Sequence, residues 1–454
     1  MVKRLIYFSL VLFTLVLSSC SKKGYMNSLP KESQLVMSIQ AEALLQKSGI
    51  KDFSSLPAAL QKIMSEPQKV GIDWAKPLYA FISENTMGAV ASISDSDKLT
   101  DYLKENSAEL GINLDSDGDY NWATTDMLLI GYNDEQLLAM TIYGDSKVFR
   151  QRAKKLMEQD AAESFAGTAS FQKLLTAGGD MAVFTDATVI PESIISSWLS
   201  FLPKDVSLAN LSALFSADFQ EGKVVAKAEI FSEEERIQQM IQQLGDVLKP
   251  QTGTFNATVP ADFTYFASFH GTPQLMEMLK KNRDIGMTLA LIEQVAPIED
   301  LLQSIDGDVM VYSRGASDIQ VYAPLSDTKI FTDDSWAHQN GIRSLENHVY
   351  GFENYTFGLT DKGDFFLSYS PVSSIGEDVA FDLSSWTDSM KNSLGFALVN
   401  CSRIKELSVL PASLRSQLDI VTARWYEPTK LDVTLSVKNQ QENILKTLLE
   451  SWTR

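Results

Sequence analysis

Apolar and polar positions along the chain form short alternating runs that lead directly into segments of helical spacing. Alternation with a period of two predicts strands, whereas apolar positions repeated every three or four residues predict amphipathic helices. Such strand–helix pairs occur at 88–94 with 95–106, 137–143 with 144–159, 224–231 with 232–248, and 431–437 with 438–452.

Polar residues at these junctions predict where the helices begin, because Ser, Thr, Asp and Asn side chains accept hydrogen bonds from first-turn amides. The predicted caps are Asp95 or Ser94, Asp145 or Ser146, a capping box of Ser232 with Glu235, and a weaker pair of Asn439 with Glu442.

A second recurring pattern is an apolar strand followed at once by a helix. It occurs at 34–49, 180–199, 262–281 and 394–410, and each copy is followed later by two strand-like runs. The segments 180–248 and 394–452 both read strand, helix, strand, turn, strand, helix. This similarity indicates internal duplication.

We therefore expect two α+β halves, at 34–250 and 262–454, each built from one long and one short strand–helix–hairpin–helix module. The segment Lys249–Asp262 is rich in turn formers and carries Pro250 and Pro260, so it is the predicted boundary. The pattern predicts antiparallel sheets with helices packed on one face.

Composition limits the classes of partner. The chain has 454 residues, 44% of them hydrophobic, and a formal net charge of −19. A body this acidic repels phosphate backbones, and no run of Lys or Arg interleaved with aromatic residues offsets the charge. We expect no nucleic-acid binding.

The first residues carry a secretory signal. Lys3 and Arg4 precede an apolar run over 5–17, and small residues lead to Cys20. The order Leu-Ser-Ser-Cys resembles the lipobox of bacterial lipoproteins, which implies that residues 1–19 are removed and that Cys20 carries lipid. Residues 20–33 are then a lipidated tether. Cys401 remains as a lone thiol, interpreted as a small buried hydrophobe.

The lipobox implies a location. We expect an anchor in the outer membrane of the cell envelope. No acidic run follows the cysteine, and in lipoproteins of this kind its absence favours the periplasmic face.

One acidic stretch has two interpretations. Asn113, Asp115 and Asp117, followed by Gly118, match the first ligand positions of a calcium loop, but Thr124 stands where the bidentate Glu belongs. The same stretch also fits a hairpin turn between two strands, which is the favoured interpretation.

Motifs for catalysis are missing from the sequence. We find no nucleophile elbow, no Walker loop, no dinucleotide-binding glycine pattern and no His-Glu-x-x-His run. We therefore predict a non-enzymatic protein without a cofactor. A hydrolase with paired carboxylates stays open, because such pairing is spatial.

Two tryptophans, Trp336 and Trp386, lie in polar, loop-like stretches and are candidate ligand contacts. They are the basis of an alternative function, the capture of a carbohydrate or lipid in a groove between the two halves. The leading hypothesis is a binding or scaffolding protein of the envelope with a protein partner.

The segments 25–49 and 66–83 resemble an uncharacterised family of Bacteroidetes lipoproteins catalogued as domain of unknown function 4836. Gly71, Ile72, Asp73 and the pair Lys76–Pro77 carry most of the resemblance. It implies a cell-envelope lipoprotein and brings no catalytic residues. The residues themselves suggest a structural role, because Asp73 can cap a turn and Pro77 can open a strand.

Overall fold

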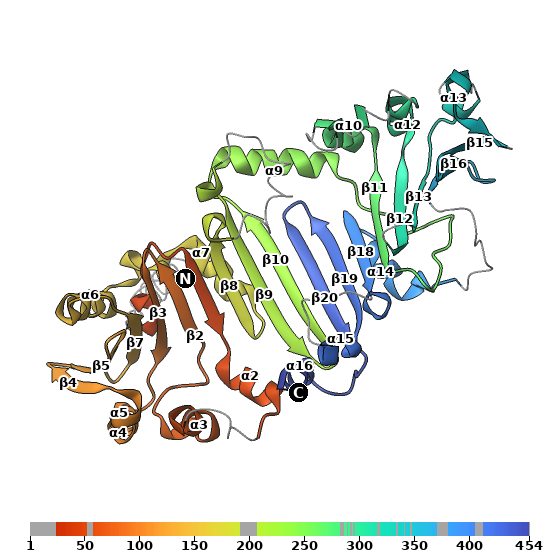
Figure 1. Ribbon diagram of the computed structural model, residues 1–454. Coiled ribbons are helices and arrows are strands. Elements are labelled where there is room, and N and C mark those ends of the chain that lie inside the picture. The colour runs from red at the N-terminus through yellow and green to blue at the C-terminus, as the bar shows by residue number, and fades with distance from the viewer. Residues whose placement is uncertain are drawn as a thin grey trace, which may run out of the picture. The chain divides into compact units, whose positions relative to one another are not determined.

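The computed structural model describes residues 24–453 except 52–57, 191–206, 282–285, 288, 291–292, 294–295, 316–317, 333–334, 340, 346, 370–379 and 405–411. Cys20 therefore lies outside the described residues. The chain forms two compact units that divide between Phe184 and Thr185 (Figure 1). Each unit combines antiparallel strands with helices, so the predicted α+β class is confirmed.

The first unit has one antiparallel sheet. Its strands are β1 (Leu35–Ile39), β2 (Leu78–Ser83), β3 (Thr86–Ser92), β4 (Asn113–Asp117), β5 (Tyr120–Thr124), β6 (Leu128–Tyr132), β7 (Gln136–Thr141) and β8 (Met181–Asp186). The strand order is β8-β1-β2-β3-β7-β6-β5-β4. β8 runs from this unit into the start of the second.

Short helices fill the connections of the first unit. The α-helices are α2 (Ala41–Ser48), α3 (Ala58–Ser65), α4 (Ser96–Glu105), α5 (Ser107–Leu110), α6 (Ser146–Glu158) and α7 (Ala169–Ala177). The 3-10 helices are η1 (Tyr25–Ser28), η2 (Pro67–Lys69), η3 (Ala161–Glu163) and η4 (Phe165–Gly167). Leu99, Tyr102 and Leu103 of α4 pack on Ala123 and Tyr132 of the sheet.

The second unit contains a longer antiparallel sheet. Its strands are β9 (Ser212–Gln220), β10 (Lys223–Phe231), β11 (Tyr265–Gly271), β12 (Gly307–Gly315), β13 (Asp318–Ala323), β14 (Arg343–Ser344), β15 (Val349–Phe352), β16 (Tyr355–Leu359), β17 (Phe365–Tyr369), β18 (Gly395–Asn400), β19 (Leu418–Glu427) and β20 (Lys430–Val437). They follow the order β9-β10-β20-β19-β18-β11-β12-β13-β17-β16-β15-β14.

Helices of the second unit lie near the ends of these strands. They are α9 (Glu235–Val247), α10 (Pro273–Lys281), α12 (Ile298–Ser304), α13 (Ser335–Gln339), α14 (Thr387–Met390), α15 (Ala412–Gln417) and α16 (Ile444–Thr453), with 3-10 helices η5 (Ala187–Val189), η6 (Leu208–Asn210), η7 (Lys329–Phe331), η8 (Leu383–Trp386) and η9 (Cys401–Arg403). α15 and α16 pack Leu414 and Ile444 against Leu418 and Val437 of the sheet. Among the described residues, no helix is both long enough and apolar enough to cross a membrane.

The same strand order occurs twice along the chain. β1, β2, β3, β7, β6, β5 and β4 are neighbours in that order, and β11, β12, β13, β17, β16, β15 and β14 repeat it. The shorter modules also correspond, because β18 lies beside β11 as β8 lies beside β1.

The division between the units lies earlier than the boundary expected at Lys249–Asp262. The hairpin of β9 and β10 belongs to the second unit because β10 pairs with β20, from Lys223 opposite Ser436 to Glu229 opposite Lys430. A short module of the first predicted half thus shares a sheet with a short module of the second.

Two helix caps are as predicted and two are different. Asp95 accepts a hydrogen bond from the Lys98 amide, and Asp145 accepts one from the Lys147 amide. The Ser232 capping box is wrong, because α9 begins at Glu235. Its N-cap residue is Glu234, whose side chain makes no capping hydrogen bond. The Asn439 cap is also wrong, because α16 begins at Ile444.

Candidate functional site

The chain enters the first unit through a tightly packed segment. Tyr25 is 7% exposed and Leu29 is fully buried, and the Tyr25 hydroxyl donates to the carbonyl of Pro77 at 2.7 Å. At the C-terminal end of α6, the Gln159 amide donates to the carbonyls of Asn27 and of Leu29. These residues fall within 20–33, which the sequence analysis assigned to the tether.

The segment that carries the family resemblance supports this packing. Gly71 has φ +79°, and its carbonyl accepts hydrogen bonds from the amides of Ser94 and Asp95. Asp73 pairs with Lys76 at 3.0 Å within a turn that leads to Pro77. Because Pro77 accepts from Tyr25, the turn helps to hold the incoming chain on the sheet.

Helix α6 concentrates positive charge beside this entry. Its sequence SKVFRQRAKKLME holds five Lys or Arg and one Glu, whereas the chain as a whole is strongly acidic. Phe149, Ala153, Leu156 and Met157 form its buried face. The helix thus presents cations on the side that faces solvent.

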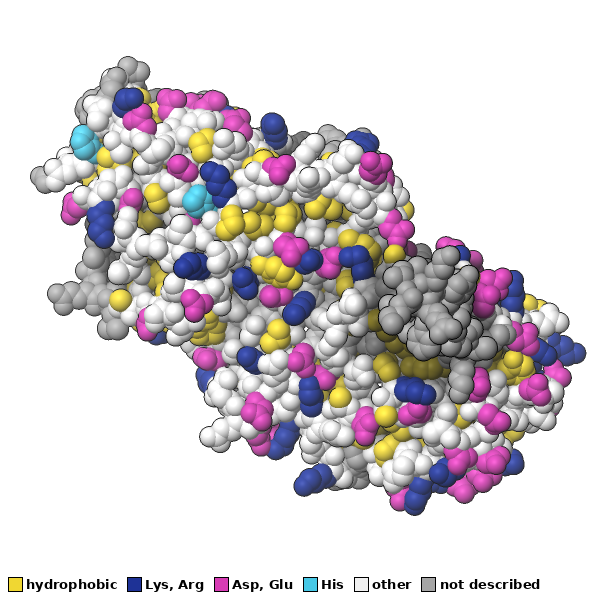
Figure 2. All heavy atoms as spheres, turned by 180° about the vertical axis from the view of Figure 1, so that it is seen from behind, with side chains coloured by type: hydrophobic (Ala, Val, Ile, Leu, Met, Phe, Trp, Pro, Cys, Tyr) yellow, Lys and Arg dark blue, Asp and Glu magenta, His cyan; other side chains and the backbone are white. Residues whose placement is uncertain are grey.

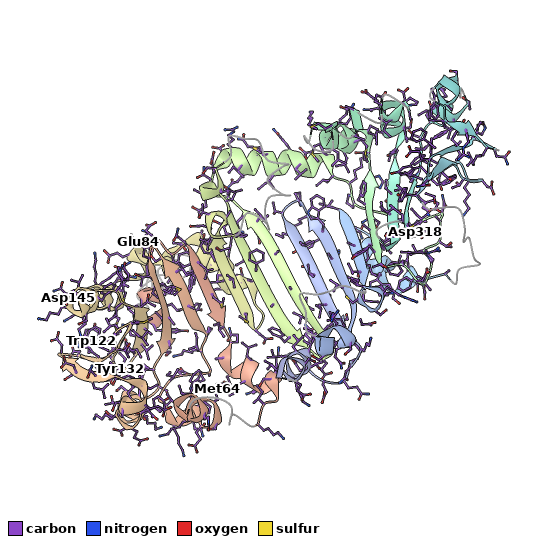
Figure 3. All side chains as sticks on the ribbon, in the orientation of Figure 1. Met64, Glu84, Trp122, Tyr132, Asp145 and Asp318 are labelled. Carbon is purple, nitrogen blue, oxygen red and sulfur yellow. The ribbon has the colours of Figure 1, made fainter. Side chains whose placement is uncertain are left out.

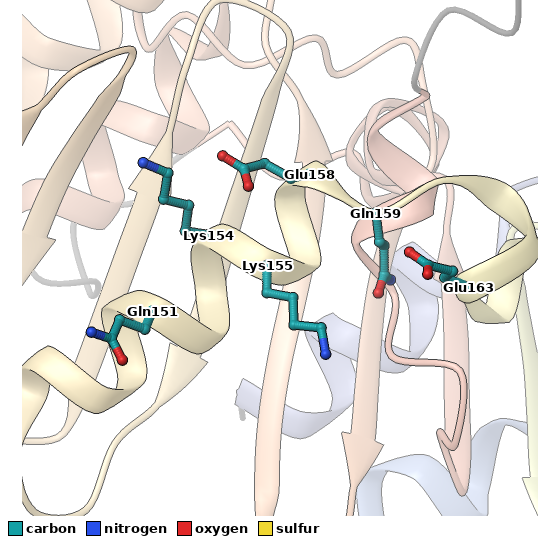
Figure 4. Close-up of a pocket in the computed structure, with 6 residues that line it drawn as sticks. All are labelled: Gln151, Lys154, Lys155, Glu158, Gln159 and Glu163. Carbon is teal, nitrogen blue, oxygen red and sulfur yellow. The ribbon is translucent and has the colours of Figure 1, made fainter.

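A shallow hollow of about 310 Å³ lies along α6 and η3, lined by Gln151, Lys154, Lys155, Glu158, Gln159 and Glu163. In Figure 4, Lys155 extends on the side of Gln159 and Glu163, whereas Lys154 points away from them. Each lining residue carries a charged or amide group at the end of its side chain.

An exposed group of hydrophobic side chains lies where α6 begins. We call Met127, Tyr143 and Val148 the apolar cluster; these residues are 74%, 58% and 61% exposed. The segment between β7 and α6 connects them, because the Ile142 amide donates to the Met127 carbonyl and Tyr143 follows directly. In Figure 3 the labels Glu84 and Asp145 mark the turn before β3 and the residue that caps α6.

The acidic stretch proposed for calcium forms a hairpin. Asn113, Asp115 and Asp117 lie along β4, which pairs with β5 from Asn113 opposite Thr124 to Asp117 opposite Tyr120. The hairpin interpretation is confirmed. An extended strand does not wrap its side chains around one ion, as a calcium loop does. Asp115 instead pairs with Arg150 at 2.7 Å, and this guanidinium lowers the pKa of the Asp115 carboxyl.

The two candidate tryptophans lie in packed aromatic groups of the second unit. The Trp336 indole donates to the Ile330 carbonyl at 3.1 Å, and its ring lies 5.3 Å from that of Tyr350. Trp386 stacks on Phe381 with ring centroids 5.3 Å apart. Each is half-buried against a hydrophobic core, so neither forms an open platform for a sugar.

Cys401 is buried and free of a disulfide, as predicted. Burial raises the pKa of its thiol, which keeps the less reactive protonated form.

One buried polar cluster was not expected from the sequence. On neighbouring strands β11 and β12, His270 Nδ1 lies 2.9 Å from Asp308 Oδ1. The other carboxylate oxygen accepts hydrogen bonds from the amides of Thr252 and Gly253 and from the Thr252 hydroxyl. Both oxygens of Asp308 are therefore committed to holding neighbouring segments.

A charged row crosses the second unit's sheet. Asp432 on β20 lies opposite Lys227 on β10 and opposite Arg424 on β19. Desolvation raises the pKa of the Asp432 carboxyl, and the two cations partly offset this effect. Figure 2 shows acidic and basic side chains interspersed over one face of the molecule. Within the described part of the chain, no group of three or more His, Cys, Asp or Glu residues is placed to hold a metal ion.

Comparison with known proteins identifies the family. The model of the family described as domain of unknown function (DUF4836) matches residues 25–333. The chain belongs to this family. The DUF4836 match begins at Tyr25, the first residue of the packed η1 segment, and includes the whole of α6.

Other comparisons add little. A search of curated proteins finds no significant match. Among solved structures, crystal form I of TP0453 is similar with a TM-score of 0.31 and 11% identity over 50% of this chain and 87% of that one. Crystal form IV of TP0453 gives a TM-score of 0.32 and 12% identity over 49% and 85% of the two chains.

Two features of the site were missed by sequence reasoning. The density of Lys and Arg in 146–158 was visible in the sequence and could have marked α6. The contact of Gln159 with Leu29 joins positions 130 residues apart, and no local pattern announces it.

Proposed function

We propose that this protein is a lipoprotein anchored in the outer membrane through Cys20, facing the periplasm, and that it acts there as a non-enzymatic binding or scaffolding protein. The lipobox at Leu17–Cys20 supports the anchor. The partner that fits this proposal is a second protein of the envelope.

The observation that carries the proposal is the packing of the chain from Tyr25 onward. It leaves only Ser21–Gly24 between the lipidated cysteine and the folded body. Four residues span at most about 14 Å when fully extended. A lipid anchor with so short a link holds the first unit against the bilayer instead of letting it diffuse at a distance.

The buried polar cluster of Asp308 and His270 fits a structural role. The His270 side chain is 15% exposed. The Asp308 carboxylate, with a side chain 1% exposed, takes three donors from Thr252 and Gly253 besides facing His270. This arrangement supports a role in fastening the chain after α9 to the sheet.

Lipidation is tested first. The natural protein and a Cys20→Ala variant are expressed in a bacterium with an outer membrane, labelled with radioactive palmitate and fractionated. We expect label and outer-membrane recovery for the natural protein and loss of both for the variant. Equal fractionation without label in either protein would refute the anchor.

In-cell cross-linking tests the binding role, with the same variant as control. One dominant protein partner that is lost in Cys20→Ala supports scaffolding. Hydrolysis of an envelope polymer by the purified protein would refute the non-enzymatic assignment.

A further inference from the structure

Helix α6 is a basic surface in an acidic protein. It has a formal charge of +4 over 13 residues, whereas the full chain has −19. A local surface of this sign attracts anions over about one Debye length, roughly 10 Å at moderate salt.

Not all of these cations are engaged within the protein. Arg150 pairs with Asp115, and Arg152 lies 3.6 Å from Glu84 and donates to Thr86. By contrast, no carboxylate of the described residues forms an ion pair with any of three lysines, Lys147, Lys154 and Lys155. Lys154 lies over the Tyr120 ring, 5.5 Å from its centroid. All three lysines can neutralise an external anion without breaking an ion pair with a carboxylate.

The apolar cluster continues the same surface. Lys147 and Val148 are neighbours in the first turn of α6. The exposed Tyr143 ring and the Phe149 ring pack edge to face, with their centroids 5.0 Å apart. Met127 extends the cluster to the start of β6. Three exposed apolar side chains next to lysines are typical of surfaces that enter the boundary between lipid headgroups and acyl chains.

The position of α6 relative to the anchor is the third observation. The C-terminal end of the helix, at Gln159, holds the carbonyls of Asn27 and Leu29. A helix of 13 residues is about 20 Å long. Asn27 and Leu29 therefore lie at one end of the helix, and the apolar cluster lies at the other.

We propose that the solvent-facing side of α6, together with the apolar cluster, is a membrane-contact surface that binds a bilayer containing anionic phospholipids. Lys147, Lys154 and Lys155 contact headgroup phosphates, and Met127, Tyr143 and Val148 enter the headgroup layer. This deepens the proposed function, because an anchor at Cys20 presents this surface to the bilayer.

Acidic residues limit the contact. Glu158 and Glu163 line the hollow with Lys154 and Lys155, and they reduce the positive charge near the C-terminal end of α6. The strongest contact is therefore expected at the first two turns, where Lys147 adjoins the apolar cluster.

The test uses the mature chain from residue 20 with Cys20→Ala, so that lipidation plays no part. Co-sedimentation is measured with vesicles of phosphatidylcholine alone and of phosphatidylcholine mixed with phosphatidylglycerol. We expect binding to the mixed vesicles at about 0.1 M salt and its loss at about 1 M salt. Equal binding to both vesicle types, or none, overturns the proposal.

A matched pair of variants locates the surface. The triple change Lys147→Glu, Lys154→Glu and Lys155→Glu is expected to weaken binding at least about tenfold. The same charge change at the exposed Lys51, Lys69 and Lys104 of the first unit, of which Lys69 pairs with Glu66, is expected to have much less effect. Equal losses in the two variants would show general electrostatics and contradict a specific surface.

The apolar cluster has its own variant, Met127→Ser with Val148→Ser. We expect weaker binding to the mixed vesicles while the far-ultraviolet circular dichroism stays unchanged. Unchanged binding would show that the apolar cluster is not part of the membrane-contact surface. If α6 cross-links to a protein and the chain does not bind vesicles, the surface binds that protein and not a bilayer.

The two proposals fail separately. Absence of label on Cys20 in cells would refute the anchor while leaving the vesicle result of the unlipidated chain intact. Normal lipidation with no vesicle binding would leave the anchor and refute the membrane-contact surface.

Discussion

Gln159 Nε2 donates a hydrogen bond to the carbonyl oxygen of Leu29 at 3.0 Å, and both residues are buried. The same amide donates to the carbonyl of Asn27. One side chain at the end of α6 thus fastens the segment that leads from the membrane anchor of the proposed function.

Gln159→Ala is expected to lower the free energy of unfolding by about 1–3 kcal/mol, because it removes both hydrogen bonds of a buried amide. Urea denaturation measures the change. Limited proteolysis should also release residues before Leu29 more rapidly. Gln151→Ala, at an exposed position of the same helix, is the control and should stay within about 0.5 kcal/mol of the natural protein.

Gly71 is expected to reject any side chain. A Cβ atom there would lie 2.1 Å from the Asp95 carbonyl oxygen, at the start of α4, and φ is +79°. We expect Gly71→Ala to cost about 3 kcal/mol, from the left-handed backbone and the clash together. Gly111→Ala is the matched control, since φ is +62° there but nothing lies within 4 Å of the added atom. It should cost about 1 kcal/mol in the same urea titration.

Local features of the fold were predictable from the sequence because they depend on neighbouring residues. Asp95 and Asp145 cap the helices that directly follow them. The prediction for Ser232 was wrong because its hydroxyl makes other hydrogen bonds. It donates to the carbonyl of Asn210, 22 residues away, and accepts from the Glu234 amide. The helix therefore begins later than the capping pattern indicates.

Strand order was not predictable, because pairing joins segments that lie far apart in the chain. β3 pairs with β7 across the whole β4–β6 insertion, and β10 pairs with β20 between two distant modules. The candidate tryptophans illustrate the same limit. The polar sequence around Trp336 suggested exposure, yet Tyr350 and Phe357, which lie on later strands, pack against its ring.

Asp308 provides a test of the buried polar cluster. Asp308→Ala should lower the free energy of unfolding by about 3 kcal/mol, because four donors lose their acceptor. Asp308→Asn should cost less, since the amide oxygen can serve Thr252 and Gly253 while its NH₂ donates to His270. Asp306→Asn, at an exposed position two residues away, should be nearly neutral.

The histidine tautomer reports this rearrangement. A carboxylate only accepts, so His270 carries its neutral-form proton on Nδ1 in the natural protein. In Asp308→Asn the proton should move to Nε2, which nitrogen-15 NMR of the imidazole detects. An unchanged tautomer would contradict the assigned contact.

Asp432 is expected to make stability depend on pH. Desolvation raises the pKa of its carboxyl above the unfolded value, in spite of Lys227 and Arg424 on the neighbouring strands. Above the folded pKa, the charged group is held in a poorly solvated place and lowers stability. As the pH falls through that pKa, the folded protein takes up the proton before the unfolded chain does, and the cost disappears.

Asp432→Asn should therefore be more stable than the natural protein at neutral pH, and this advantage should shrink as the pH falls toward about 4. Urea denaturation at several pH values measures the difference, with Asp388→Asn at an exposed position as control. A variant that is less stable at neutral pH would show that attraction to Lys227 and Arg424 outweighs desolvation. The charged row would then stabilise the sheet, and the pKa of the Asp432 carboxyl would be lowered in the folded protein instead of raised.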